Sequence, residues 1–261
     1  MLPLDVIIEF EQRSLKPFAF DWECVLERGY RRFLTPESCV IDVGGHAGRH
    51  ARVFVDEIGC RQVTLFEPLP RQYQQLQRRF APHPRVRVLP FALSSESGRQ
   101  DFIINQAAPE ESGLRERLYN NPAGKRLRSI SVEVSTLDAL SAQLGEHIDY
   151  IKIDTEGAEI DILRGATRTL ARHQPVISVE YGLSSYVAYG HDRMTLYETA
   201  TALGYRVCDL FGNPFDREQW DNVVDRFYWD YYLVPRDKAA DFQARLWDGV
   251  YRELETHCKL R

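Results

Sequence analysis

A glycine-rich turn preceded by an acid is the first segment whose residues are suited to chemistry. Asp42 ends a short apolar run, and Gly44, Gly45 and Gly48 follow it, with His46 inside the turn. Glycine permits a tight turn and lets a ligand approach the backbone closely. Dinucleotide-binding enzymes use G-x-G-x-x-G at this place, whereas the spacing here is G-G-x-x-G. Because a carboxylate at Asp42 repels a pyrophosphate but attracts an ammonium group, the turn favours S-adenosylmethionine over a nicotinamide dinucleotide.

A second acid stands where the ribose of an adenosine is expected. Glu67 ends the second predicted strand, and an acid near that point accepts hydrogen bonds from ribose hydroxyls, a feature that NAD enzymes share. Pro68 favours a rigid turn beside the adenine, and Ala92 and Leu93 follow the third predicted strand, near the adenine edge. The predicted cofactor-binding residues are Asp42, Gly44, Gly45, His46, Gly48, Glu67, Pro68, Ala92 and Leu93.

Three further acids are candidates for proton transfer. Asp154 and Glu180 end successive predicted strands, at the edge where open α/β sheets place their ligands. Glu156 falls at the start of a predicted helix, where the helix dipole stabilises an anion. A hydroxyl acceptor has to lose a proton, so Asp154, Glu180 and Glu156 are predicted as catalytic residues. Asp154 and Glu180 could also bind a divalent cation such as Mg²⁺ if they converge; the alternative for Glu180 is an ion pair with Lys152.

Alternating strands and helices must position these residues. Apolar strand patterns alternate with helical spacing along most of the chain, which is typical of β-α-β units and a parallel sheet. Strands are expected at residues 39–43, 62–66, 86–89, 99–105, 129–135, 149–153, 175–179, 205–210 and 227–234, and helices at 47–58, 70–80, 157–171 and 193–203. Residues 106–128 lack a regular pattern and are expected to form an exposed loop.

The two ends of the chain depart from this alternation. Residues 1–37 are rich in aromatic and aliphatic side chains and predict an N-terminal helical cap or lid. Residues 38–235 are expected to form one S-adenosylmethionine-binding domain. In residues 236–261 apolar side chains recur at steps of four, which indicates a C-terminal amphipathic helix. This helix is expected to pack on its own domain, with a homo-oligomer contact as the alternative.

Charge and composition restrict the partners of the chain. The 261 residues carry a formal net charge of -5, which disfavours nucleic acid as a partner. No apolar run approaches the roughly 18 residues that a membrane span needs, and the first residues lack the basic start of a signal peptide. The five cysteines are scattered, so reduced thiols are expected rather than a zinc site or disulfides. A cytoplasmic protein with a small-molecule or glycan acceptor is predicted.

Several of these segments together resemble the FkbM family of methyltransferases. The matching segments are Val40 to Gly48, Leu65 to Pro68, Ala92 to Ser94, Ser135 to Asp138, Ile151 to Ala166, and Val179-Glu180. The resemblance implies a class I methyltransferase (Rossmann-like) fold, a doubly wound and mostly parallel sheet with an antiparallel final strand. It also implies S-adenosylmethionine as donor and O-methylation of sugars or secondary metabolites. The family usually has Ala-Asn where this chain has Gly45-His46.

Other functions stay open at this point. N-methylation of an amino sugar or amide would use the same donor, and a non-catalytic S-adenosylmethionine-binding module would keep the same turn. An NAD-dependent oxidoreductase is the rival on a similar sheet, and the glycine spacing argues against it. Tyr181, Tyr186 and Tyr189 follow a predicted strand and could stack on a sugar, although aromatic side chains more often belong to a core.

Overall fold

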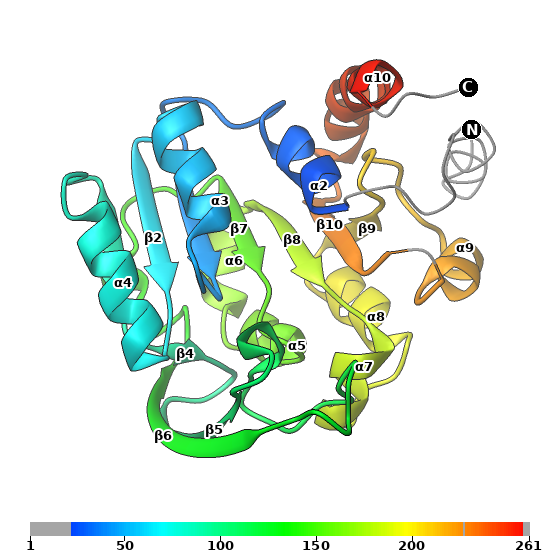
Figure 1. The fold of residues 1–261 in the computed structure, drawn as a ribbon. Coiled ribbons are helices and arrows are strands. Elements are labelled where there is room, and N and C mark those ends of the chain that lie inside the picture. Colours follow the sequence, from blue (N-terminus) through cyan, green and yellow to red (C-terminus); the bar gives the residue numbers. More distant parts are fainter. Residues whose placement is uncertain (1–21, 227, 258–261) are drawn as a thin grey trace.

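The computed structural model describes residues 22–226 and 228–257, and a seven-stranded sheet forms its centre (Figure 1). The strand order is β3-β2-β1-β7-β8-β10-β9. These strands are β1 (Cys39–Val43), β2 (Gln62–Phe66), β3 (Val86–Leu89), β7 (Tyr150–Ile153), β8 (Val176–Glu180), β9 (Tyr205–Cys208) and β10 (Asp230–Pro235). β10 runs antiparallel to both of its neighbours, and the other pairs are parallel. The predicted mostly parallel sheet with an antiparallel final strand is confirmed.

The two central strands carry a charged residue each. β1 and β7 are buried along nearly their whole length, as expected of a parallel sheet that is covered on both faces. In Figure 1, α3 lies on the near face and α6 lies behind the sheet. Asp42 of β1 and Lys152 of β7 interrupt the apolar runs, and the register places these two residues opposite each other. The chain reverses its winding direction between these strands, which is where open α/β sheets bind ligands.

Most of the predicted helices are present, with differences at their ends. The longer helices are α2 (Trp22–Tyr30), α4 (Pro70–Phe80), α8 (Thr195–Ala202) and α10 (Ala239–His257). The shorter ones are α3 (Arg49–Arg52), η1 (Val53–Ile58), η2 (Pro109–Glu111), η3 (Ser141–Gln143), α5 (Glu159–Arg164), α6 (Thr167–His173), α7 (Leu183–Tyr186), η4 (Val187–Tyr189) and α9 (Arg217–Val223). The helix predicted at 47–58 is α3 continued by the π-helical η1. α7 and α9 were not predicted because each spans fewer than two turns of periodic sequence.

The single helix predicted at 157–171 is wrong, because it is divided into α5 and α6. Gly165 follows α5, and a Cβ atom added to it would lie 2.2 Å from the carbonyl oxygen of Ser94. The backbone of this break therefore packs directly against the segment that follows β4 (Ala92–Leu93). Only a glycine permits such a close approach of two backbones.

A second, smaller sheet lies at the carboxyl ends of the central strands (Figure 1). It contains β4, β5 (Gly98–Asn105) and β6 (Leu127–Ser135) in the order β4-β6-β5. The exposed loop predicted at 106–128 is wrong for part of its length, because Glu111, Ser112, Arg117 and Tyr119 are buried. Hydrogen bonds between Ile103 and Gly113 tie the start of this loop to β5. A polar segment can thus be buried when it supplies its own hydrogen-bond partners.

Helices α2 and α10 pack beside the β10 end of the sheet (Figure 1). Leu26 and Tyr30 of α2 are fully buried, and the hydroxyl of Tyr232 in β10 donates a hydrogen bond to the carbonyl of Leu26 at 3.2 Å. Phe242 and Leu246 of α10 are also buried in the chain's own core. Residues 1–21 of the predicted cap lie outside the described residues, so the division at 1–37, 38–235 and 236–261 stays a prediction. Across the described residues, no helix combines the length and apolarity required to cross a membrane.

Two glycines with the same backbone conformation give a test of the turn after β1. Gly44 and Gly59 have φ angles of 85° and 78°. A Cβ atom added at Gly44 would lie 1.9 Å from the carbonyl oxygen of Asp154, whereas one added at Gly59 meets nothing within 4 Å. We expect Gly59→Ala to cost about 1–2 kcal/mol from backbone conformation alone and Gly44→Ala to cost clearly more. Urea denaturation measures both, and equal losses would contradict the close packing of Gly44 against the backbone of Asp154, just after β7.

Candidate active site

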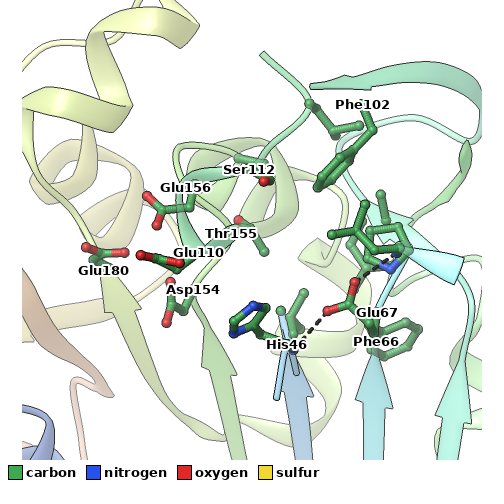
Figure 2. Close-up of a pocket in the computed structure, with 18 of the residues that line it drawn as sticks. His46, Phe66, Glu67, Phe102, Glu110, Ser112, Asp154, Thr155, Glu156 and Glu180 are labelled. Carbon is green, nitrogen blue, oxygen red and sulfur yellow. Dashed lines mark hydrogen bonds between the residues drawn. The ribbon is translucent and has the colours of Figure 1, made fainter. Parts of the chain in front are cut away.

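A cavity of about 250 Å³ opens at the carboxyl ends of β1, β2, β7 and β8. Nine of the residues predicted from the sequence line it, namely Gly44, His46, Glu67, Pro68, Ala92, Leu93, Asp154, Glu156 and Glu180. Three other predicted residues, Asp42, Gly45 and Gly48, are not among the lining residues. The two ends of the cavity differ in chemistry, as Figure 2 shows: Phe66 and Phe102 lie on one side with Glu67, and Asp154, Glu156 and Glu180 lie on the other.

The apolar end is built by the segments that follow β2 and β3 and by the small sheet. Phe66, Phe91, Ala92, Leu93 and Phe102 line this end. Phe66 comes from the end of β2, and Phe102 from β5 lies across from it in Figure 2. This end can enclose a flat, weakly polar group such as a purine ring. Sequence reasoning missed Phe102 because its strand reaches the cavity only through the small sheet.

Glu67 lies beside the apolar end and fixes the glycine-rich turn. Its Oε2 accepts a hydrogen bond from the backbone N–H of His46 at 2.8 Å, and its Oε1 accepts one from the N–H of Leu69 at 2.8 Å. His46 has a φ of 40°, an unfavourable backbone conformation for this residue that the bond to Glu67 supports. Burial raises the pKa of Glu67 to about 7, although the two backbone donors oppose this shift.

Several carboxylates gather at the opposite, acidic end. Carboxylate oxygens of Asp154, Glu156 and Glu180 all lie within 4.8 Å of one another. Glu23 from α2 and Glu110 from η2 line the same cavity, and Glu110 projects onto the acidic end in the view of Figure 2. Asp154 and Glu180, whose convergence the sequence left open, thus lie close together, and Glu156 lies beside them. Glu23 and Glu110 were not predicted, because nothing in their local sequence relates them to the ends of the central strands.

Lys152 supplies a buried positive charge beneath the acidic end. Its side chain is 3% exposed, and its Nζ donates a hydrogen bond to Oδ2 of Asp154 at 2.8 Å. The alternative that Glu180 pairs with Lys152 is thus wrong. The partner of Lys152 is Asp154, two residues further along the chain. Burial would lower the pKa of Lys152, but the charges of Asp154, Asp42 and Glu23 raise it above its ordinary value. The ammonium therefore stays charged.

Asp154 and Glu180 have pKa values displaced in opposite directions. Although burial opposes it, the charge of Lys152 lowers the pKa of Asp154, and a hydrogen bond with Glu180 adds to this effect. Burial and the nearby charge of Asp154 raise the pKa of Glu180 well above its ordinary range. One carboxylate of the pair is thus held ionised, while its neighbour tends to keep a proton. Such a displaced pair in a cavity is typical of acid–base sites.

Arg117 closes the acidic end from the loop between β5 and β6. Its side chain is 3% exposed and forms an ion pair with Glu156, and its Nη2 donates a hydrogen bond to Oγ of Ser184 at 2.6 Å. Glu156 has a φ of 62°, a left-handed conformation that is uncommon for glutamate. Arg117 was missed because the sequence predicts only an exposed loop there, and no local pattern indicates that it pairs with Glu156.

Asp42 lies under the cavity rather than in its wall. Its side chain is buried at 1% exposure, and its Oδ1 has no hydrogen-bond partner among the described residues. Burial raises its pKa, while the charge of Lys152 opposes this shift. Asp42 is therefore placed to balance Lys152 across the register of β1 and β7. Glu159, the remaining acid of the Asp154 segment, accepts hydrogen bonds from the N–H groups of Thr155 and Gly157 and caps the turn.

The histidines near the glycine-rich turn and the three candidate tyrosines divide between the cavity and the core. His46 lines the cavity, whereas His50 is buried and contacts Glu23 at 2.7 Å. Tyr181, Tyr186 and Tyr189 are all at most 6% exposed and are absent from the cavity wall. The rings of Tyr181 and Tyr186 stack on each other at 4.7 Å. They are core residues, and the suggestion that they stack on a sugar is not supported.

The acidic end does not fit a resident divalent cation. Carboxylate oxygens within 4.8 Å of one another are hard ligands of the kind that Mg²⁺ prefers. However, Asp154 is already paired with Lys152, and Glu156 with Arg117. These two cations offset the charges of two of the three candidate ligands, and the raised pKa of the third, Glu180, favours its neutral form. The suggestion that Asp154 and Glu180 bind Mg²⁺ is not supported.

Replacing Lys152 tests the charge balance of the site. Lys152→Met leaves Asp154, Asp42 and Glu23 without their shared cation, so we expect the free energy of unfolding to fall by about 3–5 kcal/mol. Lys125→Met removes the exposed ion pair with Glu116 and is the matched control; its cost should stay below about 1 kcal/mol. Urea denaturation at neutral pH measures both. Similar small losses for the two variants would show that Lys152 is not needed to hold the acids together.

Comparisons with known proteins agree with this architecture. 2-O-methyltransferase NoeI of Sinorhizobium fredii is 29% identical over 147 residues, which cover 52% of this chain and 60% of NoeI. Methyltransferase sdnD of Sordaria araneosa is 26% identical over 153 residues, which cover 48% of this chain and 59% of sdnD. The matches thus span less than two thirds of these relatives.

A solved structure and a family model also match this chain. The crystal structure of methyltransferase FkbM from Methylobacillus flagellatus superimposes with a TM-score of 0.50 at 17% identity, covering 77% of this chain and 44% of that one. This likeness identifies the fold as class I methyltransferase, Rossmann-like, as predicted. The family model described as the methyltransferase FkbM domain matches residues 42–207, well over half of the chain. The chain therefore belongs to the FkbM methyltransferase family.

Proposed function

We propose that this protein is an S-adenosylmethionine-dependent methyltransferase that methylates a hydroxyl of a sugar, a glycan or a secondary metabolite. The observation that carries the proposal is one cavity with two chemically different ends, at the switch point of the sheet. An apolar end with Glu67 suits an adenosine, and an acidic end suits a sulfonium and a hydroxyl acceptor. The similarity to NoeI, a 2-O-methyltransferase, supports oxygen as the accepting atom.

The residues of the cavity fit the donor as follows. Phe66, Pro68 and Leu93 enclose the adenine, and the carboxylate of Glu67 accepts hydrogen bonds from the ribose hydroxyls. Gly44 and His46 bring backbone close to the methionine part of the donor. S-adenosylmethionine supplies an activated methyl group on a positively charged sulfur. The negative charges of the acidic end stabilise that positive charge and hold it toward the acceptor.

The same end provides for proton removal. Asp154 stays ionised because Lys152 fixes its charge, and it can orient an acceptor hydroxyl by accepting a hydrogen bond. Glu180 lies beside it with a raised pKa, so its ionised form is the stronger base of the two. We assign Glu180 as the proton acceptor and Asp154 and Glu156 as the groups that position the hydroxyl. Positioning of this kind is worth about 7–11 kcal/mol of a reaction barrier.

Two other functions use the same cavity. N-methylation of an amino sugar or amide differs only in the accepting atom, and the acidic end also suits an amine. A non-catalytic module would bind the donor without turnover, but the acidic end has no evident role in such a protein. A cytoplasmic location, an acceptor other than nucleic acid and a homo-oligomer stay predictions.

Binding of S-adenosylhomocysteine tests the donor assignment. We expect calorimetric titration to show binding of this ligand and none of NADH. Glu67→Ala should weaken binding by about tenfold or more, equal to about 1.4 kcal/mol, whereas Glu133→Ala, an exposed acid on β6, is the matched control and should change nothing. Because the pKa of Glu67 is about 7 and only its ionised form accepts both ribose hydrogen bonds, affinity should rise with pH around neutrality.

Glu67→Ala should remove this pH dependence together with the affinity. Binding of NADH in place of S-adenosylhomocysteine would support an NAD-dependent oxidoreductase instead. Absence of any binding to the wild-type protein would refute the donor assignment.

The pH profile of methyl transfer tests the role of Glu180. Its raised pKa means that the base form is lost as pH falls through that value, so kcat/KM should rise with increasing pH in the wild type. Glu180→Gln should lower kcat/KM by about 10²–10⁴-fold and abolish the rise. Asp154→Asn removes the like charge beside Glu180, so the rise should move to lower pH.

Retained S-adenosylhomocysteine binding in both variants shows that they are folded. A Glu180→Gln enzyme with the wild-type pH profile would exclude Glu180 as the base.

A further inference from the structure

Four large apolar side chains are exposed on segments that adjoin the acidic end. Leu118 is 58% exposed, Leu183 is 50%, Val187 is 46% and Trp229 is 39%. Among the described residues one more large apolar side chain, Leu127 at 37%, is exposed to a similar degree. We call Leu118, Leu183, Val187 and Trp229 the apolar rim. Exposed large apolar residues that gather in one place mark interaction sites, whereas isolated ones are ordinary.

Hydrogen bonds hold the segments of the apolar rim together. The backbone N–H of Leu118 donates to the carbonyl of Ser184 at 3.0 Å, so the loop after β5 lies against α7. The N–H of Tyr181 donates to the carbonyl of Trp229 at 2.6 Å, and a Cβ atom added at Gly182 would lie 2.8 Å from the Trp229 ring. Figure 1 shows the loop beside α7 at the carboxyl edge of the sheet. Three chain segments thus form one surface.

The same segments build the acidic end of the cavity. Arg117 directly precedes Leu118 and pairs with Glu156. Glu180 ends β8, three positions before Leu183. Ser184 accepts from the side chain of Arg117 through its Oγ and from the backbone of Leu118 through its carbonyl. None of the four rim residues lines the cavity itself, so a molecule bound at Glu180 and Asp154 would meet the apolar rim where it extends beyond the acidic end.

The charges at this end restrict what the reacting part of that molecule can be. Five carboxylates line the cavity there, from Glu23, Glu110, Asp154, Glu156 and Glu180. The two buried cations beside them, Lys152 and Arg117, are already engaged with Asp154 and Glu156. A phosphate or carboxylate on the acceptor would meet uncompensated negative charge, whereas hydroxyl groups can donate hydrogen bonds to the carboxylates.

We propose that the acceptor is an amphiphile, with a hydroxylated and non-anionic head group in the acidic end and an apolar portion on the apolar rim. The inference rests on the proposed function, because it places the acceptor at the methyl-transfer site. The rim and the acids act on different parts of one molecule. Contact with the rim adds affinity by removing apolar surface from water, and the acids select the head group.

Alkyl glycosides provide the test. Methyl, hexyl and octyl β-glucosides, used below their micellar concentrations with S-adenosylhomocysteine present, should bind progressively more tightly. The gain should be about two- to fourfold for each methylene in contact with the rim. Octyl β-glucuronide, which adds a carboxylate to the head group, should bind at least about tenfold more weakly than octyl β-glucoside. Calorimetry gives the affinities. The fluorescence of Trp229 should change when the octyl chain binds, and this change should be absent from Trp229→Phe.

Matched variants locate the contact. Leu183→Ser and Val187→Ser should abolish the dependence on chain length while leaving methyl β-glucoside unchanged. Leu127→Ser, the same substitution at an exposed leucine in the β5–β6 pair, should retain the dependence. All three side chains are exposed, so thermal unfolding should be unchanged.

Several outcomes of these experiments would overturn the inference. Chain-length dependence absent from the wild type, no glucoside binding at all, or tighter binding of the glucuronide would overturn the inference. So would a dimer that Leu183→Ser dissociates in light scattering, or binding to phosphatidylcholine vesicles that Leu183→Ser removes, since the rim would then have another occupant. Binding of S-adenosylhomocysteine in the same preparations shows that the proposed function survives such a failure.

Discussion

The ion pair between Lys152 and Asp154 is the interaction on which the candidate site depends. A lysine in the central strand of a parallel sheet is costly to bury unless acids surround it, and Asp42, Asp154 and Glu23 do so. These acids come from β1, from the end of β7 and from α2. The ammonium of Lys152 attracts all three acids electrostatically, and its hydrogen bond keeps the carboxylate of Asp154 ionised at the cavity.

A second buried cation completes the site from the opposite side. Arg117 pairs with Glu156 and contacts Ser184, and so fastens the loop between β5 and β6 to the segment after β8. The repulsion among the five carboxylates at the acidic end is reduced because two of them form ion pairs with buried cations. The remaining negative charge faces the cavity, where a sulfonium and a hydroxyl group can use it. The strain at Glu156 is offset by this pairing.

The two ends of the cavity divide the work of a methyl transfer. Glu67 is fastened to the backbone of His46 and Leu69, so the ribose-binding carboxylate and the glycine-rich turn are held as one unit. At the other end, Lys152 lowers the pKa of Asp154, and burial together with Asp154 raises the pKa of Glu180. A fixed charge and a base thus arise from two adjacent carboxylates, because only one of them has a buried cation as its partner.

The sequence by itself determined the central strands and the acids at their ends. Buried parallel strands read as short apolar runs, and β1, β2, β3 and the strand of Asp154 could therefore be predicted. Glu67, Asp154 and Glu180 followed, because parallel strands end at one edge. Tertiary structure alone decided which charges meet. Glu23, Glu110 and Arg117 are brought to the cavity by contacts between segments distant in sequence, and Asp42 lies below the wall because successive residues of a strand point to opposite faces.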